Sequence, residues 1–185
     1  MKSRSNNTIS FVWLIAALIV TAFIWGNSLI PFVTTDGSLG GGSLGLSESV
    51  YEAMSDALDA EGLPHSWLSD RIVRKGAHVI EHLAATICYL LALRPWRLSG
   101  APSGKMSPRA RRWLLSLGIV LAIPCIDETI QLFTPGRTGQ LSDVLLDCVG
   151  VVLGIAAVLL ALCIARAIKS KNAMQAEDDP HGTLS

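Results

Sequence analysis

Histidine and carboxylate side chains recur at helical spacing in three apolar stretches of this sequence. The three groups are His78, Glu81 and His82; Asp127, Glu128 and Gln131; and Asp143 and Asp147. Residues three or four positions apart lie on one face of an α-helix, so each group presents polar side chains together. Imidazole and carboxylate groups that lie close together can transfer protons or hold a divalent cation. The candidates for catalysis, if there is any, are His78, Glu81, Asp127 and Glu128.

The first group also matches a metalloprotease pattern. His78, Glu81 and His82 form H-x-x-E-H, the inverted zinc-protease motif, to which a carboxylate from another helix could add a third ligand. The pattern fixes only three of five positions, and nothing else in the sequence resembles a peptidase. We therefore expect no metal site and no required cofactor, and we keep zinc binding by His78 and His82 as a minor alternative.

Basic residues flank these groups and could hold an anionic ligand. Arg74 and Lys75 precede His78, and Arg137 follows the second acidic group. Guanidinium and ammonium groups bind phosphate and carboxylate through charge-assisted hydrogen bonds. The predicted binding residues are Lys75, His78, Glu81, Asp127, Glu128, Gln131, Arg137, Asp143 and Asp147.

Four apolar stretches must position these residues. Of the 185 residues, 50% are hydrophobic and 16% are charged, with a mean hydropathy of +0.45 and no net charge. This composition argues against a disordered chain, a basic nucleic-acid-binding protein and a disulfide-rich secreted module. A bilayer-spanning helix needs about 20 apolar residues. We expect an all-α integral membrane protein with helices over 9–30, 76–93, 113–133 and 141–168.

The basic residues outside these stretches predict the orientation. One side of the membrane would carry Lys2 and Arg4; Arg94, Arg97, Lys105, Arg109, Arg111 and Arg112; and Arg166, Lys169 and Lys171. The other side would carry only Arg71, Arg74, Lys75 and Arg137. By the positive-inside rule, both the N-terminus (1–8) and the tail (169–185) are cytoplasmic. The polar groups then lie roughly 3–12 Å below the outer edge of the hydrocarbon layer.

The outer connection, 31–75, is the only long one. Its segment 36–49 is rich in Gly and Ser and predicts a flexible linker. Ser49 and Glu52 have the spacing of a capping box, which predicts a short amphipathic helix that ends before Gly62. This helix would lie on the outer membrane surface. The alternative is that the segment forms an acidic loop that covers the ends of the membrane helices. The apolar face of the helix would contain Tyr51, Met54 and Leu58.

The face that carries Asp143 and Asp147 continues with two glycines. Gly150 and Gly154 form a small-xxx-small pair, which lets a neighbouring helix approach closely. The polar stripe of this helix is therefore predicted to be its packing stripe as well.

Five acidic residues inside membrane helices require an explanation. A charged side chain at the bilayer centre costs about 2.5–3.5 kcal/mol on insertion scales. One interpretation is a structural bundle locked by ion pairs with Arg74, Lys75 and Arg137. Buried ion pairs are often no more stabilising than packed apolar side chains, so we favour a functional site.

These motifs resemble those of a known family. Residues 74–81 (RKGAHVIE) resemble the R-K-x-x-H-x-x-E signature of VanZ-like membrane proteins. Residues 127–139 (DETIQLFTPGRTG) resemble D-E-x-x-Q-x-F-x-P-x-R-x-x, and residues 142–150 (SDVLLDCVG) resemble D-x-x-x-D-x-x-G. Asn27-Ser28 resembles the polar end of the family's first helix. The chain departs from the pattern at His82, where the family usually has Tyr, which argues against a zinc-ligand pair.

The resemblance implies a multi-pass protein of the bacterial cytoplasmic membrane. The family's founding relative raises resistance to teicoplanin, a lipoglycopeptide that acts at the outer face of this membrane. We expect an outer-leaflet polar pocket that recognises a membrane lipid, a lipid-linked cell-wall precursor or a lipoglycopeptide, without catalysis and without nucleic acid. The alternative is a hydrolase or transferase that acts on a lipid-linked phosphate or glycan, with His78 and a carboxylate as acid and base.

Overall fold

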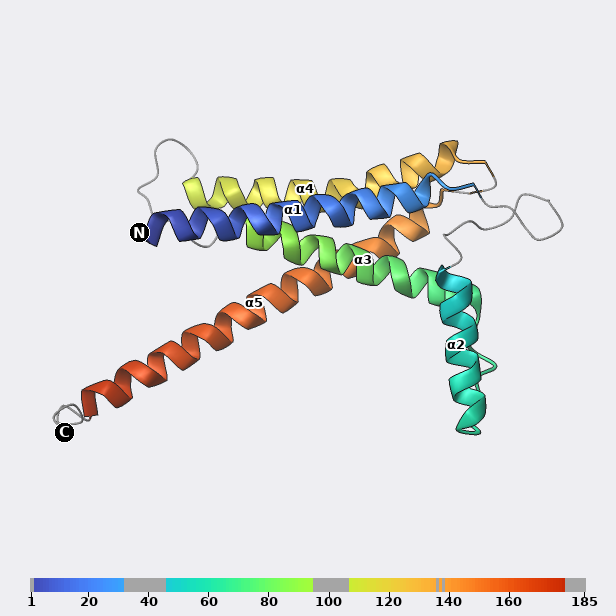
Figure 1. Ribbon diagram of the computed structural model, residues 1–185. Helices are drawn as coiled ribbons and strands as arrows, with labels where there is room; N and C mark the ends of the chain where they lie inside the picture. The colour runs from blue at the N-terminus through green and yellow to red at the C-terminus, as the bar shows by residue number, and fades with distance from the viewer. Residues whose placement is uncertain (1, 32–45, 95–106, 136, 138, 179–185) are drawn as a thin grey trace.

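The computed structural model describes residues 2–31, 46–94, 107–135, 137 and 139–178, and these residues form helices joined by short connections (Figure 1). The helices are α1 (Lys2–Ser28), α2 (Leu46–Ala60), α3 (Asp70–Leu93), α4 (Pro108–Phe133) and α5 (Leu141–Asp178). Four of them, α1, α3, α4 and α5, are long and apolar enough to cross a membrane. The expectation of a helical protein with four candidate membrane spans is confirmed.

Helix α3 is the centre of the bundle. It makes its most extensive contacts with α5 and α1, while α4 packs against α1, α3 and α5. Figure 1 shows α1 and α4 side by side, and α5 crossing below them so that its C-terminal half diverges from the other helices. Helix α2 packs against α3 and, in Figure 1, lies beside the start of α3 and extends away from α1 and α4.

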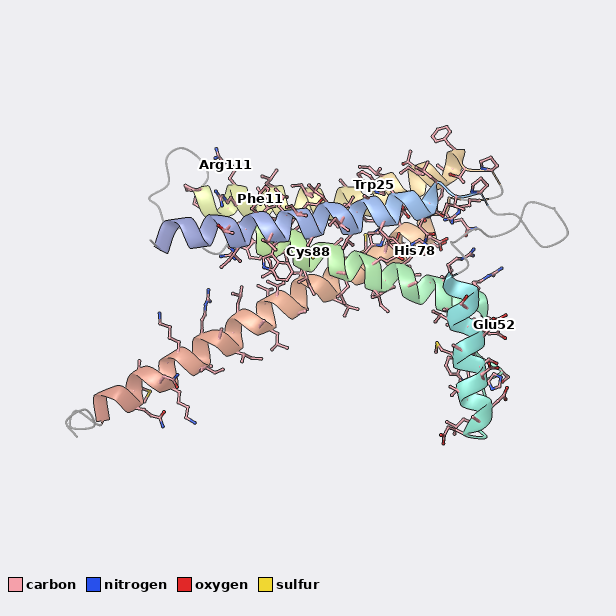
Figure 2. The ribbon with its side chains drawn as sticks, in the orientation of Figure 1. Phe11, Trp25, Glu52, His78, Cys88 and Arg111 are labelled. Carbon is pink, nitrogen blue, oxygen red and sulfur yellow. The ribbon has the colours of Figure 1, made fainter. Side chains whose placement is uncertain are left out.

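The outer surface of the helices is apolar, and much of the polar material is buried. Large hydrophobic side chains such as Phe11, Ile19 and Leu160 are more than half exposed (Figure 2). His82, Asp127 and Asp147, by contrast, are 1% exposed or less. An aqueous protein buries its large apolar side chains, so this distribution is that of a protein whose surroundings are lipid.

An apolar core holds α1, α3, α4 and α5 together. Tyr89 of α3 extends its hydroxyl to the Thr21 hydroxyl of α1 at 3.2 Å, which joins these two helices within the apolar layer. The buried members of this core are Ala17, Ile24, Ala85, Cys88, Tyr89, Val120, Ile123 and Val151.

The helices extend further than hydropathy predicts. Helix α3 begins at Asp70, ahead of the predicted stretch 76–93, because Ser69 is its N-cap and accepts a hydrogen bond from the Ile72 amide at 3.4 Å. Helix α5 continues past 168 to Asp178 through a charged segment. Hydropathy marks where apolar residues stop, whereas a helix ends only where its hydrogen bonding is interrupted.

The predicted start of α2 is wrong. The helix begins at Leu46, so Ser49 and Glu52 lie inside it and do not form a capping box. An i, i+3 pair fits a helix interior as well as a cap, which is why the spacing misled the prediction. The predicted end is correct: α2 stops at Ala60, and Gly62 follows with a φ of +66°. Most of the predicted linker, 36–45, lies outside the described residues.

Helices α3 and α5 approach each other at the two predicted glycines. A Cβ atom on Gly150 would collide with the Val79 carbonyl oxygen and lie 3.1 Å from the His82 Cβ. A Cβ atom on Gly154 would lie 2.8 Å from the Thr86 Cβ and 2.9 Å from the Leu83 oxygen. Both positions therefore require glycine, and the predicted packing stripe is confirmed.

We predict that Gly150→Ala will lower the free energy of unfolding by about 1–3 kcal/mol, the usual cost of overpacking a closely packed contact. Gly118→Ala in α4 is the matched control, because a Cβ atom there meets nothing within 4 Å. Circular dichroism during denaturation of the detergent-solubilised proteins measures the free energy of unfolding of both variants. Equal stability of the two variants would contradict the close α3–α5 contact.

Candidate functional site

A cavity of about 220 Å³ lies where α3 and α5 begin and α4 ends. Exposure of its lining decreases from Arg71, which is exposed, through half-buried Arg74 and His78 to buried Glu128 and Asp147. The cavity therefore has a basic rim and an acidic floor. Its lining residues are Arg71, Arg74, Lys75, His78, Glu128, Gln131, Arg137, Gln140, Asp143, Leu146 and Asp147. His78 and Arg111 lie at opposite ends of the bundle in Figure 2.

One ion pair joins α3 to α5 at the rim. The Lys75 Nζ lies 2.9 Å from the Asp143 Oδ1, and both side chains are partly exposed. Partly exposed ion pairs contribute about 0–1 kcal/mol, so this pair orients the two helices more than it stabilises them.

Two histidines of α3 face one carboxylate of α5. The Asp147 Oδ1 lies 3.6 Å from the His82 Nδ1 and 3.9 Å from the His78 Nδ1. The His82 Nδ1 is also 2.9 Å from the His78 carbonyl oxygen. A carbonyl only accepts hydrogen bonds, so the His82 proton is on Nδ1. The proton then occupies the His82 nitrogen that faces Asp147, and the unprotonated His82 Nε2 is buried without a hydrogen-bond partner among the described residues, so this tautomer leaves one nitrogen able to bind a metal ion.

A hydrogen-bonded group ties α4 to α1 behind the cavity. The Gln131 Nε2 donates to the Asp127 Oδ2 at 2.9 Å and approaches the Ser28 Oγ at 3.4 Å. The Thr134 hydroxyl donates to the Ser28 carbonyl oxygen at 3.0 Å. Because all four residues are buried, these bonds hold Asp127 in one orientation.

Arg137 lies between α4 and α5, and its Nη2 donates to the Asn27 carbonyl oxygen of α1 at 2.9 Å. Burial lowers the pKa of the guanidinium, as does Arg74, while the carboxylates of Asp127 and Glu128 oppose this shift. Arginine remains protonated in spite of such shifts. Arg137 therefore contributes a fixed positive charge at the cavity.

The turn between α4 and α5 holds Glu128 in place. The Gln140 amide donates to the Glu128 Oε2 at 2.9 Å. A Cβ atom on the adjacent Gly139 would lie 2.7 Å from both the Glu128 carbonyl oxygen and the Leu132 Cγ. Only glycine allows the turn to return this close to α4, a role that the sequence analysis did not assign.

The structure brings most of the predicted binding residues to this cavity. Asp127 lies behind the lining and reaches it through Gln131. Glu81 does not line the cavity, and its Oε2 is buried without a hydrogen-bond partner among the described residues. The predicted residues that line it are Lys75, His78, Glu128, Gln131, Arg137, Asp143 and Asp147.

Three lining residues were missed by the sequence analysis: Arg71, Gln140 and Leu146. Arg71 precedes Arg74 by three positions, so the same helical spacing would have found it if α3 had been extended back to Ser69. No comparable signal marks Gln140 or Leu146.

Comparison with known protein families gives one match. The sequence model of the VanZ/LLP1 family matches residues 8–163, which include parts of all four candidate spans. The chain belongs to the VanZ/LLP1 family. No curated protein and no solved structure matches it. In this VanZ/LLP1 protein, the three segments that carry the family resemblance all contribute to one cavity.

We predict that Gln131→Leu will destabilise this VanZ/LLP1 protein by about 1–3 kcal/mol, because it removes the hydrogen bond to the buried Asp127 carboxylate. Thr129→Val is the control: it lies on the same helix, is exposed, and bonds only to the Cys125 carbonyl oxygen one turn before it. Thermal unfolding in detergent, followed by circular dichroism, compares the two. A Gln131→Leu protein as stable as Thr129→Val would show that the bond is not needed.

Proposed function

We propose that the cavity binds the anionic headgroup of an amphiphile, such as a lipid-linked envelope intermediate or a lipoglycopeptide. The observation that carries this proposal is the gathering of Arg71, Arg74, Lys75 and Arg137 around one cavity of an otherwise apolar bundle. Guanidinium groups bind phosphate and carboxylate oxygens through paired, charge-assisted hydrogen bonds.

The charge of the rim is available to a ligand. Lys75 is paired with Asp143, whereas Arg71, Arg74 and Arg137 form no ion pair with an acidic side chain of the described residues. Unpaired guanidinium groups around a partly buried cavity favour an anionic ligand over a neutral one.

The size of the cavity limits what enters it. Pockets for drug-sized ligands have volumes of about 300–1,000 Å³. At about 220 Å³, this cavity suits a phosphate or another small headgroup, but not a whole glycopeptide. The rest of an amphiphile would lie along the apolar helix surface, where Leu145 and Ile80 are more than 60% exposed.

The predicted orientation places the cavity in the outer leaflet, which is where lipid-linked precursors and teicoplanin act. We propose that binding there contributes to teicoplanin-type resistance. Expression in a sensitive bacterium should then raise the inhibitory concentration of teicoplanin more than that of a glycopeptide without an acyl tail. Equal inhibitory concentrations with and without the protein would count against this role.

Headgroup binding can be measured with hexadecyl phosphate and the detergent-purified full chain. Each charge-assisted hydrogen bond is worth about 1.5–3 kcal/mol, so Arg137→Gln and Arg74→Gln should each raise Kd by about 10- to 100-fold in isothermal titration calorimetry. Arg111→Gln, at the other end of the bundle, should leave Kd unchanged. Equal Kd values for all three variants would contradict the proposal.

The second candidate function is hydrolysis or transfer of a lipid-linked phosphate or glycan. It is favoured by His78, which lines the cavity and has its Nδ1 3.9 Å from the Asp147 Oδ1. Release of phosphate from hexadecyl phosphate by the wild-type protein, and its loss in His78→Gln or Asp127→Asn, would establish catalysis. Binding without release, with both variants fully active in the resistance assay, would rule out proton transfer by these residues.

A further inference from the structure

Buried carboxylates gather at and behind the floor of the cavity, and no Lys or Arg of the described residues forms an ion pair with them. Asp127, Glu128 and Asp147 are each 5% exposed or less, and an oxygen of each lies within 4.8 Å of one from the other two. No Lys or Arg nitrogen of the described residues lies within 4.0 Å of these carboxylates. Buried carboxylates this close together cannot all remain charged without a cation or added protons.

Two of these carboxylates have one buried oxygen without a hydrogen-bond partner among the described residues. The Asp127 Oδ2 accepts the hydrogen bond from Gln131, while its Oδ1 is buried with no hydrogen-bond partner. The Asp147 Oδ1 faces the two histidines, while its Oδ2 is likewise buried with no partner. Asp127 therefore resembles carboxylates that bind metals, in which an outer hydrogen bond orients the ligand oxygen.

The third carboxylate is anchored in a similar way. The Glu128 Oε2 accepts from the Gln140 amide, and the glycine at 139 brings that amide to it. Asp127 and Glu128 are therefore oriented by hydrogen bonds from α4 and from the α4–α5 turn, while Asp147 faces the histidines of α3.

Asp147 also belongs to a second group of candidate ligands, His78, His82 and Asp147, whose ligand atoms lie within 4.8 Å of one another. The His78 Nδ1 is buried, has no hydrogen-bond partner, and lies 3.9 Å from the Asp147 Oδ1. This distance is too long for a hydrogen bond but fits two ligands of one metal ion, each about 2.0–2.2 Å from it. His82 differs, because its Nδ1 donates to the His78 carbonyl oxygen. The His82 nitrogen nearest Asp147 is therefore a protonated donor, and its Nε2 is buried without a hydrogen-bond partner among the described residues.

We propose that Asp127, Glu128, Asp147 and His78 form a binding site for one divalent cation. A mixed set of carboxylate oxygens and one imidazole nitrogen suits Mn²⁺ or Zn²⁺ better than Ca²⁺ or a thiolate-bound metal. The site goes beyond headgroup binding and does not depend on it, because its ligands are protein side chains at and behind the cavity floor. A bound cation would replace part of the missing positive charge there.

The test uses the full chain, purified in detergent, stripped with a chelator and titrated with MnCl₂. Electron paramagnetic resonance of free Mn²⁺ gives the number of ions bound, and competition with ZnCl₂ compares the two metals. We expect one saturable ion per chain and a higher thermal unfolding temperature when it is bound. Absence of saturable binding at millimolar MnCl₂ and ZnCl₂ would overturn the proposal and indicate a protonated carboxylate cluster.

Variants locate the ion. Loss of an outer hydrogen-bond partner weakens metal binding by about 10- to 100-fold. Asp147→Asn and His78→Gln each remove a ligand, so they should weaken Mn²⁺ binding by more than this. Asp143→Asn is the matched control, a carboxylate of the same cavity that is paired with Lys75, and it should bind normally. His82→Tyr should also retain the ion. If His82→Tyr loses the ion and His78→Gln keeps it, His82 is the ligand and the proposed set is wrong.

Two measurements separate this proposal from others. Circular dichroism of each variant shows whether it is folded, and the metal-dependent rise in the unfolding temperature of the wild-type chain stands even where a variant fails to fold. Titration of the chelator-stripped protein with hexadecyl phosphate tests headgroup binding separately, so failure of one proposal leaves the other intact.

Discussion

The close approach of α3 and α5 is the contact on which the rest of the polar site depends. Gly150 and Gly154 let the two backbones meet without side chains between them. At this separation Lys75 reaches Asp143, and the two histidines of α3 face Asp147. A side chain at either glycine would push the helices apart by more than these contacts allow, so the geometry of the site is determined by two residues that carry no chemistry.

The bundle divides its interior between two kinds of packing. Apolar side chains fill the middle, around residues such as Tyr89 and Val151, and hold the helices by shape. Polar side chains fill one end and hold α1, α4 and the α4–α5 turn by hydrogen bonds, such as those of Thr134 and Arg137 to backbone oxygens of α1. Lipid provides no hydrogen bonds, so polar groups within it must find their partners inside the protein.

The sequence predicted which helices carry the site better than it predicted where those helices begin and end. Helical spacing correctly grouped Asp143 with Asp147 and the two glycines, because period and face follow directly from helix geometry. Hydropathy missed the first turn of α3 and hence Arg71, because a cap and not an apolar residue begins that helix. Which side chains meet between helices depends on helix rotation, which spacing within one helix does not determine. This is why Glu81 was predicted to line the cavity and does not.

The divergence of α5 from the bundle gives this helix the mechanics of an unequal lever. Its fulcrum is the crossing with α3 near Gly150, from which the cavity end at Leu141 is about 14 Å away and the far end at Asp178 about 42 Å. A tilt about this fulcrum that moves the cavity wall by one ångström moves the far end about three times as far, in the opposite direction. A small displacement of α5 at the cavity would therefore accompany a much larger one at its far end, if the helix moved as a rigid rod.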